Sequence, residues 1–120
     1  MTTSDIAKDL VAMCAAGKFD EAGEKYWADD AVSREAMDGP MARIQGKDAL
    51  RGKGEWWANA HEVPSSTVVG PYVNGDQFIV RFTMDITVKE SGQRMSMDEM
   101  GLYTVKNGKI VEEAFFQPGA

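Results

Sequence analysis

Glu99 is the residue whose position most strongly suggests chemistry. Residues 77–89 alternate between apolar and polar types, and pairing residues 93–106 against them in a hairpin places Glu99 on the apolar face. A carboxylate on such a face is costly to bury unless it is paired or protonated, and burial raises its pKa toward the range useful for acid/base catalysis. Three interpretations stay open: a functional acid or base, a carboxylate paired structurally with a donor side chain, or a slipped register that places Glu99 outside.

The hairpin formed by residues 77–106 is the basis for this placement. If Ser91 and Gly92 form a two-residue loop, Met84 lies opposite Glu99 on the neighbouring strand. One face of the hairpin is then apolar apart from Glu99. The opposite face is mixed and suits solvent or a partner subunit; it includes Arg81, Asp85 and Asp98.

Other side chains that often carry chemistry are scarce. With one histidine and one cysteine, a zinc site is not expected, and no loop has the oxygen-ligand pattern of a calcium site. His61, at the end of a predicted helix, is interpreted as a capping or surface residue and Cys14 as a core residue. Gly52 and Gly54 lie inside a helical segment, so they do not form a phosphate-binding loop. We therefore expect neither a metal nor another cofactor.

Composition restricts the class of protein. The chain has 120 residues, a mass of 13.2 kDa and 43% hydrophobic residues, which fits one domain spanning residues 1–120. A net charge of −6 and a pI of about 4.7 disfavour binding to nucleic acid and to anionic membrane surfaces. No signal-peptide pattern or membrane-spanning apolar run is present, so a cytoplasmic location is expected.

Hydrophobic periodicity predicts helices first and strands afterwards. The first helix has Thr3 or Ser4 as its N-cap and Gly17 as its C-cap. The predicted helices are 4–16, 19–27 and 47–61. The predicted strands are 31–36, 67–73, 77–89, 93–106 and 109–117. This order predicts an α+β fold in which the last strands form an antiparallel meander.

Large apolar side chains are the expected walls of any ligand pocket. Aromatic residues cluster on the predicted helices, and the eight methionines suit irregular or adaptable apolar space. Most of these residues belong to a core, and some are expected to line a cavity. The candidate ligand-binding residues are Tyr26, Trp27, Trp56, Trp57, Met84, Met97, Tyr103 and Phe115.

Short motifs along nearly the whole chain resemble those of a known superfamily. They are Ala-Gly-Lys-Phe-Asp at 16–20, Tyr-Trp-Ala-Asp-Asp-Ala-Val at 26–32, Gln-Gly-Lys-Asp-Ala-Leu at 45–50, Val-Gly-Pro-Tyr at 69–72 and Tyr-Thr-Val-Lys-Asn-Gly-Lys-Ile-Val at 103–111. In this order they resemble the nuclear-transport-factor-2-like superfamily, and more narrowly its SnoaL-like branch. The resemblance implies a cone-shaped, curved antiparallel sheet wrapped around about three N-terminal helices, an apolar pocket, and homodimers packed through the sheet. It does not fix an activity.

Relatives in this superfamily include ketosteroid isomerase, polyketide cyclases and limonene epoxide hydrolase. By this resemblance, Glu35 stands where the isomerase has its catalytic base. Gly101, and Leu10 or Val11, stand where the isomerase has its oxyanion donors, so ketosteroid isomerisation is not expected. Glu35 with Glu99 is a different acid/base pair that could span a pocket. The epoxide hydrolase arrangement would select Arg81, Asp85 and Asp98, which the predicted register places on the outer face.

The direction of the last strand depends on the turn at Asn107 and Gly108. The resemblance implies a bulged turn, which would point Glu113, Phe115 and Gln117 into the cone. A simple two-residue turn would instead point the alternate set inward, namely Ile110, Glu112, Ala114 and Phe116.

Two functions from different classes follow from these patterns. The first is an enzyme without cofactors that acts on a small apolar or amphipathic molecule, using Glu99 and Glu35 as acid/base carboxylates. The second is a non-catalytic ligand-binding or accessory homodimer in which Glu99 is structural or orients the ligand. A module that uses the outer sheet face for assembly is a third possibility.

Overall fold

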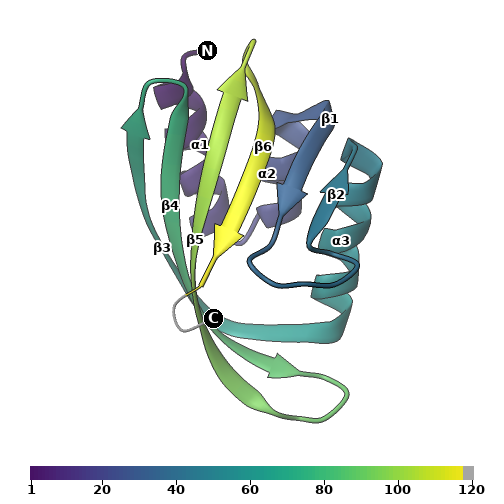
Figure 1. The fold of residues 1–120 in the computed structure, drawn as a ribbon. Helices are drawn as coiled ribbons and strands as arrows, with labels where there is room; N and C mark the ends of the chain where they lie inside the picture. The colour runs from purple at the N-terminus through teal and green to yellow at the C-terminus, as the bar shows by residue number, and fades with distance from the viewer. Residues whose placement is uncertain (118–120) are drawn as a thin grey trace.

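Residues 1–117 are described by a computed structural model and form three helices and one six-stranded sheet (Figure 1). The elements are α1 (Thr3–Ala15), α2 (Phe19–Tyr26), β1 (Trp27–Arg34), β2 (Arg43–Gln45), α3 (Lys47–Ala60), β3 (His61–Asn74), β4 (Gln77–Val88), β5 (Arg94–Lys106) and β6 (Lys109–Phe116). The strand order is β2-β1-β6-β5-β4-β3. The predicted α+β class is confirmed, but the sheet is mixed because β1 runs parallel to β6.

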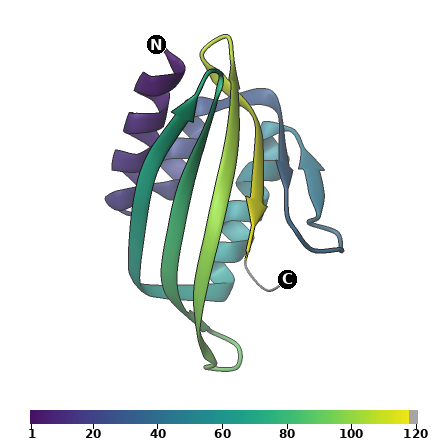
Figure 2. The ribbon, with the colours of Figure 1, turned by 60° about the vertical axis from the view of Figure 1, so that its left-hand side comes forward.

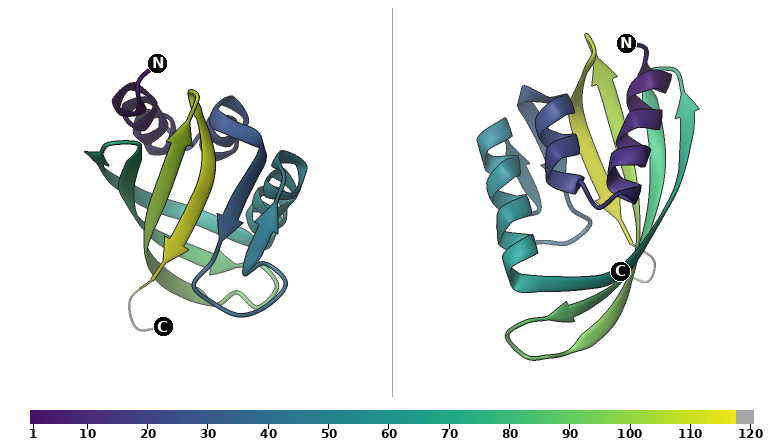
Figure 3. Two further views of the ribbon diagram at one scale, coloured as in Figure 1. Left: turned by 45° about the horizontal axis from the view of Figure 1, so that its top comes forward. Right: turned by 180° about the vertical axis from the view of Figure 1, so that it is seen from behind.

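The helices all lie on the concave side of the curved sheet (Figure 3, right). Strands β3, β4 and β5 run side by side, and the β4–β5 hairpin extends beyond the rest of the sheet (Figure 2). The core between helices and sheet combines residues of α1, α2 and the three strands β4, β5 and β6, including Ile6, Leu10, Tyr26, Phe78, Val80, Tyr103 and Ile110. Within residues 1–117, no helix has both the length and the apolar character needed to cross a membrane.

Helix α1 has well-defined signals at both ends. Thr2, rather than the predicted Thr3 or Ser4, is the N-cap: its hydroxyl accepts from the Asp5 amide at 3.1 Å, and the Asp5 carboxylate accepts from the Thr2 amide at 3.0 Å. Gly17, with φ of +79°, follows the C-cap Ala16. The amides of Gly17 and Lys18 then turn back onto carbonyls of the last helical turn, which ends the helix.

The transition from helix to sheet occurs earlier than predicted. Trp27, predicted as the end of a helix, is the first residue of β1 and pairs with Ile110 of β6. Parallel pairing joins strands that are distant in the chain, so local periodicity gives no sign of it. The short strand β2 was not predicted, and β3 begins at His61 instead of Thr67 because its polar first half pairs with β4.

The predicted pairing of the β4–β5 hairpin is wrong by two residues, although both faces are assigned correctly. Phe82, and not Met84, lies opposite Glu99. The loop is longer than two residues: the Val88 amide donates to the Gln93 carbonyl at 2.8 Å and the Gly92 amide donates to the Val88 carbonyl at 2.7 Å, so residues 89–92 make the turn. Side chains alternate with a period of two, so a shift of two residues preserves the inward orientation of Glu99.

A bulge in β6 decides which of its residues enter the core. Asn107 and Gly108 form a tight turn with φ of +53° and +76°, after which Val105 pairs with Ile110. The register then shifts, so Thr104 pairs with Glu112 and Val111 is the extra residue. Ile110 therefore points inward, and so do the residues that the resemblance assigned to the interior, Glu113, Phe115 and Gln117.

The outer face of the sheet carries Arg81, Asp85 and Asp98, as predicted. Arg81 donates from Nε and Nη2 to the two carboxylate oxygens of Asp98 at 2.9 and 2.6 Å. Asp85 accepts from Ser65 and Ser96 on the two neighbouring strands at 2.8 and 3.1 Å. These residues lie away from the concave side, so they do not form a site with Glu99.

The concave face is tightly packed around Gly101. A Cβ at this position would lie 2.9 Å from Cε2 of Tyr103 and 3.1 Å from Cε1 of Phe115, and both rings are held by packing. We expect Gly101→Ala to lower the free energy of unfolding by about 1–3 kcal/mol because the added methyl overpacks the site. Urea denaturation measures this change.

The matched control for Gly101→Ala is Gly52→Ala on α3, where a Cβ would meet nothing within 4 Å. Alanine is the better helix former, so this variant should gain up to about 1 kcal/mol. Equal loss of stability in both variants would show that the Gly101 contacts are not the cause.

Candidate functional site

Glu113 is a carboxylate buried at the centre of the concave side. The bulge in β6 points it inward, and it is 7% exposed. Trp27 Nε1 donates to its Oε1 at 2.6 Å, and Ser33 Oγ donates to its Oε2 at 3.0 Å. Burial raises the pKa of Glu113, whereas the Trp27 and Ser33 hydrogen bonds and the nearby Lys53 lower it. Both oxygens thus have hydrogen-bond donors, and the net effect of burial on this carboxyl is a raised pKa.

Lys53 connects Glu113 to a second carboxylate, Glu35. Its Nζ lies 2.5 Å from Glu35 Oε1 and 3.0 Å from Ser33 Oγ, so the Ser33 hydroxyl lies between Lys53 and Glu113. The same ammonium is 5.4 Å from the centre of the Phe115 ring. The side chains of Lys53 and Glu35 are each 17% exposed, so solvent reaches this ion pair.

Glu99 is the third carboxylate on this side. It lies partly buried on β5, and Gln117 Nε2 donates to its Oε2 at 3.1 Å. Burial raises the pKa of Glu99 to about 6, and the neighbouring Glu35 and Glu113 act in the same direction. The Gln117 hydrogen bond and Lys53 oppose this rise. Glu99 can therefore gain or lose a proton close to neutral pH, which general acid/base chemistry requires.

These four side chains, Glu35, Lys53, Glu99 and Glu113, form what we term the inner charged cluster. Glu35 directly follows β1, Lys53 lies on α3, Glu99 lies on β5 and Glu113 lies on β6. Within residues 1–117, no three histidine, cysteine, aspartate or glutamate side chains are grouped as ligands for a metal ion. The cluster combines one ammonium with three carboxyl groups, which suits proton transfer and the binding of polar groups.

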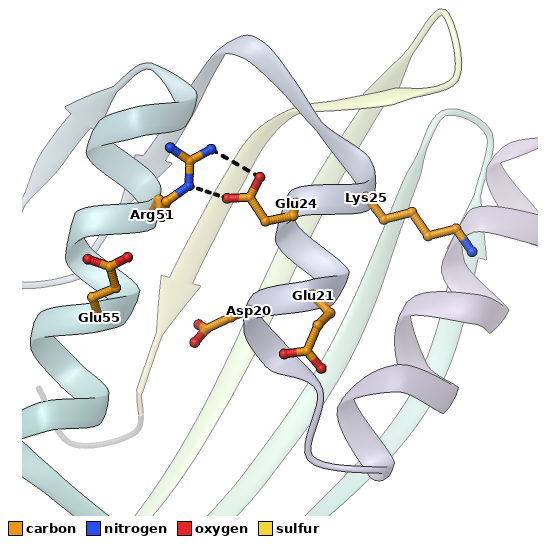
Figure 4. A pocket seen from close by; sticks show the side chains of 6 residues that line it. All are labelled: Asp20, Glu21, Glu24, Lys25, Arg51 and Glu55. Atoms are coloured by element: carbon orange, nitrogen blue, oxygen red, sulfur yellow. Dashed lines mark hydrogen bonds and ion pairs between the residues drawn. The ribbon is translucent and has the colours of Figure 1, made fainter.

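Two open clefts of the surface lie elsewhere. One lies between α2 and α3 and is lined by charged residues (Figure 4): Asp20, Glu21, Glu24, Lys25, Arg51 and Glu55. Arg51 reaches across it to pair with Glu24, and its Nη2 donates to Glu24 Oε2 at 3.0 Å. Another cleft lies at the N-terminus of α3, lined by Asp29, Arg51 and residues 45–49. Neither cleft is lined by the inner charged cluster.

The comparisons with known proteins agree with this fold. The family model described as the SnoaL-like domain matches residues 1–117. The chain belongs to the SnoaL-like family. A solved structure from Mesorhizobium loti, provisionally named a SnoaL-like polyketide cyclase, is 57% identical with a TM-score of 0.94, over 97% of this chain and 99% of that one. No curated protein matches the chain.

Two more distant structures support the fold of the SnoaL-like domain alone. A nuclear-transport-factor-2-like protein from Burkholderia thailandensis is 18% identical with a TM-score of 0.81, covering 97% of this chain and 90% of its own. A Bacillus subtilis protein provisionally named an isomerase is 20% identical with a TM-score of 0.78, covering 96% and 88%. At such identities the shared fold does not carry over an activity.

The SnoaL-like fold brings together part of the predicted site. Glu35 and Glu99 both join the inner charged cluster, and Trp27 binds Glu113 directly. Tyr103 and Phe115 pack edge to face with ring centres 6.1 Å apart. Met84 and Met97 are paired across β4 and β5, both partly buried.

The remaining predicted residues contact other groups. Tyr26 is buried, and its hydroxyl donates to Asp9 on α1. Trp57 stacks on His61 at 4.6 Å between ring centres, and Trp56 is 55% exposed. His61 caps α3, with its Nδ1 2.9 Å from the Trp57 carbonyl oxygen, in line with its interpretation as a capping residue.

Lys53 and Ser33 were not singled out from the sequence of this SnoaL-like protein, and each had a detectable signal. Lys53 is three residues after the buried Leu50, so it lies on the inner side of α3. Ser33 alternates with the buried Ala31 on β1, which places it on the same side as Glu35. A polar residue at an apolar position of the periodic pattern is therefore the sign to look for.

Removing the Lys53 ammonium should destabilise the protein. Lys53→Met leaves the Glu35 carboxylate without its partner in a mostly buried position, so we expect a loss of about 3 kcal/mol in the free energy of unfolding at pH 7.5. Lys25→Met, which breaks the exposed Lys25–Asp9 pair, is the matched control and should have little effect. If both variants unfold at the same urea concentration, the inner pair is not a structural requirement.

The raised pKa of Glu99 makes stability depend on pH. The folded value of about 6 exceeds the ordinary value of 4.5, so the folded state favours the protonated carboxyl, and this contribution is lost as the pH rises from about 4.5 to 6. Glu99→Gln lacks this dependence. At pH 8 it should be more stable than the wild type by about 2 kcal/mol, and near pH 4 the two should be similar.

Thermal unfolding of Glu99→Gln and wild type across pH 4–8 measures this difference. Glu62→Gln, at an exposed position of β3, controls for the general effect of removing one negative charge. A constant difference between Glu99→Gln and wild type over this range would contradict the raised pKa.

Proposed function

We propose that this SnoaL-like protein binds a small apolar or amphipathic molecule beside Glu99 and that Glu99 transfers a proton to or from it. The observation that carries the proposal is the state of Glu99: partly buried, close to two other carboxylates, and with a pKa of about 6. A group that titrates near the working pH serves both as acid and as base. The proposed chemistry uses neither a metal nor a redox cofactor.

Glu35 and Lys53 support this role as a pair. Their ion pair fixes both side chains close to Glu99. Glu35 is paired with the ammonium, whereas Glu99 has no cationic partner among residues 1–117, and two carboxylates in different environments are the usual basis for separate acid and base roles. The ketosteroid reaction itself is not proposed, because Gly101 has no side chain to donate and Leu10 is an apolar core residue.

The second candidate is a ligand-binding or accessory protein without catalytic activity. The observation that favours it is that each carboxylate of the cluster already has a partner: Lys53 for Glu35, Gln117 for Glu99, and Trp27 with Ser33 for Glu113. Structural carboxylates can also have shifted pKa values. In this case Glu99 would orient a ligand without proton transfer.

In either case we propose a homodimer that packs through the outer face of the sheet. Apolar side chains border the Arg81–Asp98 pair on this face, including Val69 and Phe116, which are 41% and 45% exposed, and the partly buried Ile79, Met100 and Leu102. Apolar surface next to a paired charge is suited to a symmetric interface.

Native mass spectrometry of freshly purified protein tests both proposals. We expect twice the 13.2 kDa chain mass, with a co-purified small molecule that serves as the first substrate candidate. In turnover assays with that molecule, Glu99→Gln should reduce the rate by at least 100-fold, and if the molecule is neutral its affinity should stay nearly unchanged. Full turnover in Glu99→Gln would support the non-catalytic role of this residue, and a monomer would contradict the dimer.

A further inference from the structure

A continuous chain of hydrogen bonds connects the partly exposed ion pair of the inner charged cluster to its buried carboxyl group. Lys53 Nζ lies 2.5 Å from Glu35 Oε1 and donates to Ser33 Oγ at 3.0 Å. Ser33 Oγ donates in turn to Glu113 Oε2, also at 3.0 Å. The two side chains of the ion pair are each 17% exposed, whereas Ser33 is fully buried and Glu113 is 7% exposed. The chain of hydrogen bonds therefore leads from solvent into the interior.

The donors around Glu113 restrict where it can receive a proton. Its Oε1 accepts from Trp27 Nε1 at 2.6 Å, and an indole N–H acts only as a donor. Its Oε2 faces the Ser33 hydroxyl, which has one hydrogen and two lone pairs. A hydroxyl can give its hydrogen to one neighbour while it takes a hydrogen from another. Ser33 is thus placed to pass a proton from Lys53 to Glu113.

Other titratable side chains near Glu113 do not offer such a path. Those that interact with it electrostatically are Cys14 on α1, Lys53 on α3, Glu35 after β1, and Glu99 and Tyr103 on β5. Burial raises the pKa of Cys14 to about 12 and the pKa of Tyr103 above its ordinary value, so both keep their protons near neutral pH. Among residues 1–117, the side chains hydrogen-bonded to Glu113 are Trp27 and Ser33.

We propose that Ser33 and Lys53 form a proton relay through which Glu113 exchanges a proton with solvent while the protein stays folded. The Ser33 O–H bond breaks as its hydrogen moves to Glu113 Oε2, and a new O–H bond forms with a hydrogen from the Lys53 ammonium. Lys53 is left as a neutral amine, and a proton from water restores its ammonium. The net change is one proton taken from solvent and bound to Glu113.

The relay gives the inner charged cluster a way to respond to pH. Ionised Glu113 raises the pKa of Glu99, so the two carboxyl groups titrate as a coupled pair. A proton that reaches Glu113 removes this negative charge, and Glu99 then loses its own proton at a lower pH. The relay goes beyond the proposed function and does not depend on it, because none of its steps involves a ligand.

The indole N–H of Trp27 reports the charge of Glu113, because it donates directly to Oε1. Its ¹H–¹⁵N NMR signal is followed in the full chain from pH 4 to pH 9. In the wild type we expect a single signal that moves with pH, as rapid exchange between the two charge states requires. Glu113→Gln should remove most of this movement, whereas Glu62→Gln, on an exposed part of β3, should retain it.

Lys53→Arg separates the relay from the structural role of Lys53. Arginine keeps the positive charge and the hydrogen-bond donors but does not release a proton. Line shapes and relaxation dispersion of the Trp27 signal give the exchange rate at the midpoint of the titration. We expect this rate to be at least about tenfold lower in Lys53→Arg, because the proton then reaches Glu113 only when the structure opens locally.

Two substitutions of Ser33 test the hydroxyl in the same way. Ser33→Ala removes it and should lower the exchange rate at least about tenfold as well. Ser33→Thr keeps a hydroxyl and should retain most of the wild-type rate. Thermal unfolding of each variant confirms that it is folded, and if Ser33→Ala does not fold, Lys53→Arg decides the question alone.

Three results would overturn the relay. A Trp27 signal that does not move with pH in the wild type would show that Glu113 keeps one charge state. Movement that persists in Glu113→Gln would assign the titration to another group. A wild-type exchange rate in folded Lys53→Arg or Ser33→Ala would show that the proton reaches Glu113 by another path. None of these results bears on ligand binding beside Glu99, which native mass spectrometry and turnover assays test separately.

Discussion

The bulge at Val111 is the constraint on which the interior depends. It lets β6 place Ile110 against the helices and, beyond it, turn Glu113 toward the same side. A regular strand would have continued the Ile110 alternation and put Glu113 on the outer face. The bulge therefore introduces an ionisable group into a core that is otherwise apolar, and the polar residues around it have a structural cause.

The neighbours of Glu113 follow from that constraint. Trp27 and Ser33 on β1 donate to its two oxygens, and the parallel pairing of β1 with β6 places both within reach. Lys53 then binds Ser33 and Glu35, so the helix α3 is tied to the sheet by polar contacts. Glu99 lies at the border of this network, where burial and its acidic neighbours raise its pKa. The same charged side chains therefore hold the helix to the sheet and form the candidate site.

The sequence predicted orientation better than pairing. The inward position of Glu99 depends on the alternation of side chains along β5. The predicted pairing was wrong by two residues, and a shift of two residues leaves each side chain on the same face, so this position was still predicted correctly. The start of β1 at Trp27 and its pairing with β6 could not be predicted, since the partner strand lies at the other end of the chain. Thr2 was missed as N-cap because Thr3 and Ser4 are equally suitable residue types, and the Asp5 carboxylate decides between them.

Glu99 could be predicted as a site residue because its type is unusual at its position. Lys53 could not, because its type is common at such a position. A glutamate in an apolar row is conspicuous, whereas a lysine in an amphipathic helix with charged neighbours is not. Lys53 has a defined role only once α3 is packed on the sheet beside Glu35. The resemblance supplied Glu35 and the inward direction of Glu113, which periodicity alone left open.

Helix α3 is attached to the sheet by an unusual balance of forces. Within the described part of the chain, Leu50 is the one residue of this helix that is buried in the core, and two interior glycines weaken the helix itself. The Lys53 contacts with Glu35 and Ser33 therefore contribute to its attachment. Local opening of α3 must separate these charges, so the free energy of that opening includes the electrostatics of the cluster. A bound molecule that changes the charge beside Glu99 would consequently also change how often this helix detaches.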